Sequence, residues 1–311
     1  MTLKSLSTCT FATLFTLFAL PAHANDLETV CDDQSSGGAY LCGTALEFGG
    51  QAALLRDLFL GRHHGASPGD SGFTASTSGA ANAYTGVASV GAQVTSGNFS
   101  GNMQALVLGA DRSLSDGSFL GVMLQFGQST VTAPASPRVD RREILVGPYF
   151  AGDFGSELYL DGYLLFGQPD YTVANVPTNG ESIVGSVTLS KGLQGNGMTY
   201  VLYSSLSIKQ EEPSAIQDIN AAILTLGGSL RSEDRRIANG WQQNFARLEV
   251  DFGSYEDNLG TGTIRYVAPR ITLGTDIALD SGATVNLSAN ASAASDQTYI
   301  FGVRAAYNLQ F

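Results

Sequence analysis

The stretch YIFGVRAAYNLQF, Tyr299 to Phe311, decides how the rest of the chain is interpreted. Side chains of a β-strand point alternately to its two faces. One face of this stretch is apolar throughout, with Tyr299, Phe301, Val303, Ala305, Tyr307, Leu309 and Phe311. The other face carries Ile300, Gly302, Arg304, Ala306, Asn308 and Gln310. The alternation predicts a strand with one apolar face and one mostly polar face.

Other segments repeat this alternation, among them SELYLDGYLLFGQ (156–168), MTYVLYSSLSIK (198–209) and QNFARLEVDFGS (243–254). Strands of soluble proteins usually run for about 5–6 residues. These segments are longer, and a tilted strand needs about 9–11 residues to cross a bilayer. Strand length therefore favours a membrane barrel over a soluble sandwich.

The connections between the segments alternate in length. Tight turns are expected at 113–117, 152–156, 193–197 and 279–282, and roomier connections at 132–140, 168–180, 210–218 and 255–262. Short periplasmic turns and longer outer loops are typical of outer-membrane barrels. We expect twelve strands, at 85–95, 101–112, 118–131, 141–153, 156–168, 181–193, 197–209, 217–231, 241–254, 262–278, 283–293 and 298–311.

The predicted fold class is therefore all-β, a twelve-stranded antiparallel transmembrane β-barrel. The sheet must close, because an open edge would leave backbone amides unpaired in hydrocarbon. Polar residues on the second face would then line the lumen. The candidates are Glu157, Asp161, Arg247, Glu249, Asp251, Arg270, Asp276 and Arg304. They fit either an ion path or a paired, solvated wall, and one sequence does not identify a selective ring.

The first 24 residues are expected to be a cleaved signal peptide. Lys4 gives a positive start, Phe11 to Leu20 is a short apolar run, and the segment ends in the small-residue pattern at Ala22–Ala24. A lipoprotein is disfavoured, because Cys9 lies inside the apolar run and small residues do not precede Cys31. Cys31 and Cys42 are then expected to form a disulfide in the oxidising periplasm, and half of a metal site is the weaker alternative.

The charge of the chain excludes one class of partner. Its net charge is −12, which argues against binding to nucleic acid. Charged residues make up 14% of the chain, below the roughly 25% of soluble domains, which again favours a membrane protein. We expect no cofactor and no metal.

Three stretches resemble the autotransporter translocator, the outer-membrane β-domain of type V secretion. LGADRSLSDGSFLGVMLQFGQS (108–129) and GPYFAGDFGSELYLDGYLLFG (147–167) resemble its early hairpins. The terminal GVRAAYNLQF, with Tyr307, Leu309 and Phe311, resembles the assembly signal of outer-membrane barrels in general. The resemblance covers about 72–311 and implies export, assembly machinery with periplasmic chaperones, and lipids of the cell outer membrane as partners. We expect a monomer.

In the family, a helix before the first strand threads the lumen and joins an exported passenger. Residues 44–62 could form that helix, because Phe48, Ala52, Leu55 and Phe59 share one face. An amphipathic helix packed beneath the barrel in the periplasm is the alternative. The expected organisation is a signal peptide at 1–24, a segment at 25–71 and a barrel at 72–311. The segment holds the disulfide loop (31–42), the helix (44–62) and a hinge (63–71).

The chain departs from the family upstream of the helix, where only residues 25–43 stand between the expected cleavage site and the helix. The predicted function is a non-enzymatic autotransporter-type barrel that anchors or translocates only a very short N-terminal segment. The alternative is a small porin-like diffusion channel of the outer membrane.

The stretch RHHGASPGDSGF, Arg62 to Phe73, raises a third hypothesis, because G-D-S-G surrounds the nucleophile of many serine proteases. A nucleophilic serine needs a base and a third group that orients the base. Only His63 and His64 are available after cleavage, both close to Ser71 in sequence. The turn-forming residues Gly65, Pro68, Gly69 and Gly72 favour a hinge over an enzyme active site.

Overall fold

The computed structural model describes residues 36–64 and 84–310, apart from 98–99, 115–117, 133–137, 174, 215–217, 258–262 and 294–297. Within these ranges one helix precedes a thirteen-stranded antiparallel sheet. The elements are α3 (Ser36–His64), β1 (Tyr84–Gly97), β2 (Ser100–Ser113), β3 (Phe119–Thr132), β4 (Val139–Asp153), β5 (Leu158–Val173), β6 (Val176–Gly195), β7 (Met198–Pro213), β8 (Ile219–Arg231), β9 (Arg235–Ile237), β10 (Gly240–Asp257), β11 (Thr263–Leu279), β12 (Thr284–Ala293) and β13 (Thr298–Gln310).

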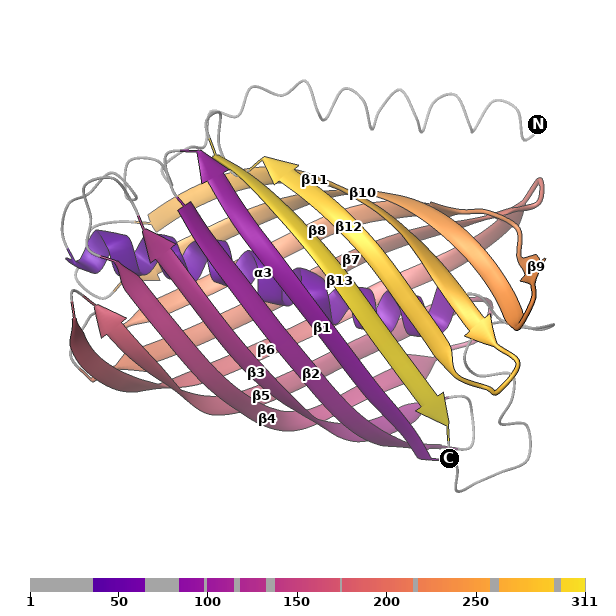
Figure 1. The fold of residues 1–311 in the computed structure, drawn as a ribbon, viewed down its shortest axis with the longest axis horizontal. Coiled ribbons are helices and arrows are strands. Elements are labelled where there is room, and N and C mark those ends of the chain that lie inside the picture. The colour runs from indigo at the N-terminus through magenta and orange to yellow at the C-terminus, as the bar shows by residue number, and fades with distance from the viewer. Residues whose placement is uncertain are drawn as a thin grey trace.

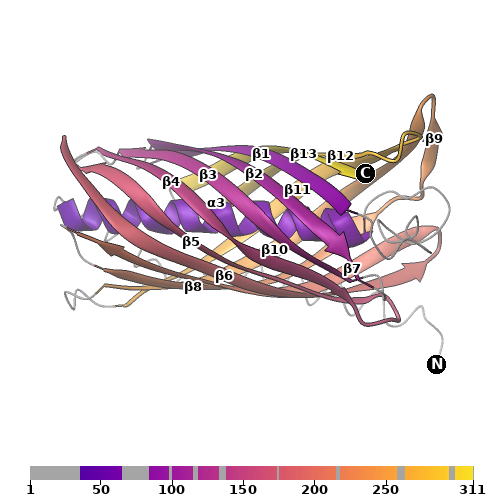
Figure 2. The same ribbon diagram turned by 90° about the horizontal axis from the view of Figure 1, so that it is seen from below.

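The sheet closes into a barrel around α3 (Figures 1 and 2). The first strand, β1, pairs with the last, β13, in a register that joins Thr85 to Gln310. The circle runs through β8, β10 and β11, and it leaves β9 as a short addition paired to the start of β10. Apart from β9, twelve strands form the closed wall, as the alternation predicted. Closure matters because each strand finds hydrogen-bond partners on both sides.

The two faces of the wall have the predicted composition. Large apolar side chains are exposed on the outside, among them Leu120 and Val122 of β3 and Leu273 of β11. On β13, Tyr299, Phe301 and Val303 face outward while Arg304 and Ala306 are buried. An apolar outside and a polar, filled inside are the reverse of a soluble protein, and they match a barrel in contact with lipid.

We use the pairing of Thr85 with Gln310 to define the C-terminal end of the barrel. The turns at this end differ in length, since the connection from β8 to β10 is long and contains β9. Between β6 and β7 the turn consists of Asn196 and Gly197, with φ angles of 52° and 73°. Both angles are positive, which is the requirement of a type I′ hairpin turn, and Asn-Gly is the pair that meets it most easily.

The roomy connection predicted at 168–180 is wrong over most of its length, and those predicted at 210–218 and 255–262 are wrong at their first residues. The strands continue into them: β5 reaches Val173, β6 begins at Val176, β7 reaches Pro213 and β10 reaches Asp257. Prolines and polar residues in these stretches favoured loops, since proline lacks a ladder N–H. The strands nevertheless extend beyond the apolar band, where outward polar side chains carry no cost. The expected difference between short turns at one end of the barrel and longer loops at the other is therefore smaller than predicted.

The helix is longer than predicted, running over Ser36–His64 in place of 44–62. It lies inside the barrel, so the alternative of a helix packed beneath it is wrong (Figure 2). Its centre, QAALLRDLFL, consists mostly of strong helix formers. Among the described residues, no helix is both long and apolar enough to cross a lipid bilayer.

The predicted hinge at 63–71 needs correction at its start. His63 and His64 are the last residues of α3 and are buried inside the barrel. The rest of the hinge, with Ser71, lies outside the described residues, as do the signal peptide and Cys31. Cys42 lies within α3, so the predicted 31–42 disulfide remains a prediction.

Candidate functional site: the occupied lumen

The lumen is filled by α3, and from Gly50 to Leu60 the helix is buried on every side. Its apolar residues Phe48, Leu55 and Phe59 are as inaccessible as its charged residues Arg56 and Asp57. A helix buried all round must find partners for each charge, because an unpaired buried charge is very unfavourable. The barrel wall supplies these partners in three places along the helix.

The first cluster lies toward the end opposite the C terminus. Glu47 pairs with Arg141 near the start of β4 and accepts a hydrogen bond from the Ser129 hydroxyl at 2.7 Å. One turn later, Gln51 donates to Glu143 Oε1 at 3.0 Å. Arg141 also pairs with Glu143 at 2.7 Å. The wall and the helix thus share one network here.

The second cluster lies between the other two along the helix, where adjacent residues of opposite charge bind the barrel wall. Arg56 pairs with Glu249 at 2.6 Å and donates to the Thr225 hydroxyl at 2.9 Å. Asp57 pairs with Arg247, which lies on the same strand as Glu249, β10. The two pairs form a reciprocal clamp, since each side contributes one acid and one base.

The wall around this clamp continues the network away from the helix. Arg270 pairs with Asp251 at 2.7 Å, and Arg231 pairs with Asp276 at 2.5 Å. Arg304 lies 4.0 Å from Asp57 and donates to the backbone carbonyl of Leu54 at 3.5 Å. Strands β10 and β13 therefore pair with α3 directly, while β11 joins the network through β10 and β8 joins it through β11.

Aromatic rings fill the space between the charged clusters. Phe59 packs against Tyr149 and Tyr163, with ring centroids 5.8 Å and 6.3 Å apart. Tyr203 donates its hydroxyl to Glu249 Oε1 at 2.7 Å. Inward tyrosines combine an apolar body with a polar tip, so they can contact both parts of the helix.

The third cluster holds the last turn of α3. His63 Nε2 and Asp161 Oδ1 lie 2.5 Å apart, and His64 Nε2 and Ser190 Oγ lie 3.1 Å apart. The Tyr159 ring stacks on His63 at 4.3 Å. The serine and the carboxylate bind different histidines, so these contacts do not align into a Ser-His-Asp relay.

Seven of the predicted lumen charges are buried inside the barrel: Asp161, Arg247, Glu249, Asp251, Arg270, Asp276 and Arg304. Glu157 is an exception, because it lies in the turn before β5 with a positive φ of 59°. The strand was expected to start at 156, whereas β5 begins at Leu158. Of the predicted assembly signal, Tyr307 faces outward and Leu309 belongs to β13, while Phe311 lies outside the described residues.

Sequence reasoning missed several lumen partners. Arg141 and Glu143 alternate at the start of β4, a signal that could have identified them. Lys209 and Glu211 form an ion pair at 2.7 Å. They were missed because the connection expected at 210–218 begins between them. Among the described residues, no group of three or more His, Cys, Asp or Glu side chains could hold a metal ion.

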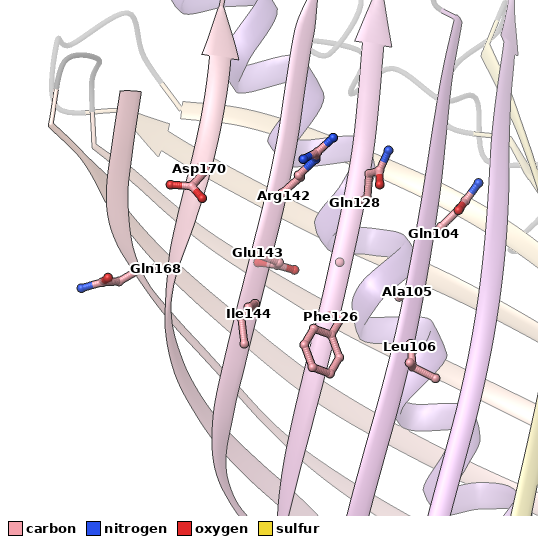
Figure 3. Close-up of a pocket in the computed structure, with 11 residues that line it drawn as sticks. Gln104, Ala105, Leu106, Phe126, Gln128, Arg142, Glu143, Ile144, Gln168 and Asp170 are labelled. Atoms are coloured by element: carbon pink, nitrogen blue, oxygen red, sulfur yellow. The ribbon is translucent and has the colours of Figure 1, made fainter. Parts of the chain in front are cut away.

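The outer surface carries a groove of about 460 Å³ over β2 to β5 (Figure 3). Its polar side is a cross-strand row in register: Gln104, Gln128, Arg142 and Asp170. The adjacent outward row contains Leu106, Phe126 and Ile144, which are exposed. The change from an apolar to a polar row marks one border of the apolar band.

These contacts make the lumen a filled interior in which most of the buried charges are paired. Removing one partner of a buried ion pair typically costs about 3–5 kcal/mol, because the other charge stays buried and unpaired. The helix is therefore held strongly in place, and leaving the lumen would require the loss of several such pairs together.

Comparison with known proteins agrees with this architecture. Residues 79–222 match the family model described as "Autotransporter beta-domain". No curated protein matches the sequence. The β-domain of the Bordetella autotransporter BrkA is similar over 75% of this chain and 100% of its own, at 18% identity and a TM-score of 0.61.

Two further solved structures are similar. The translocator domain of the autotransporter NalP from Neisseria meningitidis aligns over 86% of this chain and 99% of its own, at 13% identity and a TM-score of 0.57. An outer-membrane channel from Pseudomonas putida aligns over 79% of this chain and 100% of its own, at 12% identity and a TM-score of 0.52. Residues 79–222 thus match the model of the autotransporter β-domain, and the barrel shares its fold with these outer-membrane structures.

Proposed function

We propose that this barrel resides in the outer membrane, where it anchors α3 without catalysing a reaction. It would carry the short segment between the expected cleavage site and the start of α3, residues 25–35, to the cell surface. The C-terminal end of the barrel would face the periplasm. In this orientation the helix would run from the outer end of the lumen to the inner end.

The direction of α3 is the observation that carries the proposal. Its early residue Glu47 contacts Arg141 near the start of β4, at the end opposite the C terminus. Its last turn contacts Asp161 near the start of β5, at the C-terminal end. A chain that enters the helix from outside and leaves it in the periplasm is the arrangement expected after translocation of the N-terminal segment.

The outer surface supports the membrane placement. The outward residues of β4 between the polar Arg142 and the end of the strand include Ile144, Val146 and Phe150, all exposed. An outward apolar band about 25 Å tall is typical of outer-membrane barrels. Such a surface would be unfavourable in water, and lipid is its natural environment.

Surface exposure of the N-terminal segment tests the proposal. We would insert a short epitope after Asn25 and add antibody to intact cells. Labelling of intact cells is expected, and the same epitope inserted in the periplasmic turn at Asn196–Gly197 should be labelled only after the outer membrane is opened. Labelling of the first epitope only in opened cells would refute the proposed orientation.

A small diffusion channel is the second candidate, favoured by the fold that this barrel shares with the Pseudomonas putida channel. Planar-bilayer recordings distinguish the two. The full-length protein should show little steady conductance if α3 fills the pore, and deletion of residues 25–66 should raise it. A large steady conductance of the full-length protein would support the channel instead.

The absence of catalysis is also part of the proposal. The wild type and the Ser71→Ala and Ser190→Ala variants should all be inactive toward ester substrates. An esterase activity in the wild type that either substitution abolishes would overturn this part.

A further inference from the structure

The central network contains one arginine without a carboxylate of its own. Arg56 pairs with Glu249, Arg247 with Asp57, Arg270 with Asp251 and Arg231 with Asp276. Arg304 is left to share Asp57, at 4.0 Å. The other carboxylate that interacts with it electrostatically is Asp276, which Arg231 already binds. Among the described residues, this cluster therefore has one buried positive charge in excess.

A small cavity lies beside this excess charge. It occupies about 30 Å³ between α3 and the wall, with Arg270, Asn290 and Arg304 on its wall side. The helix side is lined by Gly50, Ala53, Leu54 and Asp57, and the small Gly50 and Ala53 leave the space there. A cavity needs roughly 10–15 Å³ of this kind of volume to admit one water-sized particle. There is room for a single small ion but not for a phosphate or an organic acid.

Two of the cavity's arginines have spare hydrogen-bond donors. Within the described part of the chain, neither Arg270 Nη1 nor Arg304 Nε has a hydrogen-bond partner. Both residues are more than nine-tenths buried. A buried guanidinium N–H without an acceptor is costly, and an anion would satisfy both the hydrogen bonds and the charge.

The nearest other carboxylate along the helix is Glu47, which already pairs with Arg141 and accepts a hydrogen bond from Ser129. Glu47 precedes Asp57 by ten residues, or about 15 Å of helix. Glu47 is therefore not placed to serve as the counterion of Arg304 beside Asp57, and a group inside the cavity would supply one.

We propose that the barrel binds a small monovalent anion, chloride or a similar halide, between Arg270 and Arg304 at the contact of α3 with strands β11 to β13. The anion would join the helix to the last strands of the barrel, where Asp57 alone serves two arginines. The proposal concerns the folded barrel and stands whether or not the export function is correct.

Bromide provides the direct test. Crystals of the full-length protein would be grown in sodium bromide, and anomalous scattering would be measured at the bromine absorption edge. An anomalous peak in the cavity is expected. If the cavity shows no anomalous peak and holds only water-like density, the proposal is overturned.

Thermal unfolding in detergent provides the second test. At constant ionic strength, exchange of sodium gluconate for sodium chloride should raise the unfolding midpoint saturably, by roughly 5 °C, because a ligand bound only by the folded state stabilises it. Arg304→Gln should abolish the rise, while the exposed control Arg138→Gln should retain it.

A third variant covers the case in which Arg304→Gln fails to fold. Ala53→Leu keeps every charge and fills the cavity from the helix side, so it should abolish both the bromide peak and the chloride effect. Equal midpoints in chloride and gluconate for the wild type, or a chloride effect that persists in Ala53→Leu, would refute the site.

Discussion

Replacing Asp57 by Asn should loosen the helix in the lumen. Asp57 pairs with Arg247 and lies 4.0 Å from Arg304, and all three side chains are buried. The amide of asparagine keeps the size of the side chain but removes its charge, so both arginines lose their counterion. Breaking a buried pair in this way costs about 3–5 kcal/mol.

The expected effect follows from this magnitude. Each 1.4 kcal/mol changes an equilibrium tenfold, so the population with α3 displaced should rise by roughly two to three and a half powers of ten. In planar bilayers, Asp57→Asn should therefore show frequent openings that the wild type lacks. On gels, the heat-shifted band should appear at a lower temperature.

Two variants serve as controls for the clamp. Asp140→Asn removes an exposed carboxylate that pairs with Arg138 at 2.8 Å, and exposed pairs contribute about 0–1 kcal/mol. It should leave the conductance unchanged. Adding Arg247→Met to Asp57→Asn removes one uncompensated charge and should partly restore closure. Wild-type conductance in Asp57→Asn, or equal openings in Asp140→Asn, would contradict the proposed clamp.

Three further predictions concern packing and the lipid face. Phe59→Ala removes a ring packed on Tyr149 and Tyr163 and should lower the stability of the barrel by about 3–5 kcal/mol. Its heat-shifted gel band should appear at a lower temperature, and the lipid-facing control Leu164→Ala should change that temperature much less. Gly253→Ala should reduce the refolded fraction in detergent, because the new Cβ would lie 1.9 Å from the Tyr266 ring; Gly185→Ala, with its nearest atoms at 3.4 Å, should refold normally. Val303→Lys, at the middle of the outward face of β13, should lower the free energy of unfolding in lipid vesicles by about 2–4 kcal/mol, and Gln128→Lys in the polar row should not.

The strands were predictable because a membrane barrel repeats one simple constraint. Lipid outside and polar groups inside require apolar and polar side chains to alternate along every strand. In β13 this alternation can be recognised from the sequence of the strand alone. The extension of β5 and β6 into 168–180 was missed because the outward side chains Gln168 and Asp170 are polar there, whereas a spanning strand was expected to be apolar outside. Only pairing with neighbouring strands shows that Asp170 opposes Arg142 and Asn179.

The lumen partners were predictable in kind but not in identity. The inward faces of β10, β11 and β13 supplied Arg247, Asp251, Arg270 and Arg304 as lumen candidates. Sequence also placed Arg56 and Asp57 on the predicted helix, away from its apolar face. Which acid meets which base depends on the shear of the strands and on the rotation of α3, and neither leaves a local sequence pattern.

The amino-acid sequence by itself determined the closed antiparallel barrel with an apolar outside, because contact with lipid requires the same alternation in every spanning strand. The tertiary structure alone decided that α3 lies inside the barrel and that His63 and His64 end it as lumen contacts. It also decided that Arg304 is the arginine left beside a cavity. These features depend on residues as far apart as Asp57 and Arg304, which only the closure of β1 on β13 brings together.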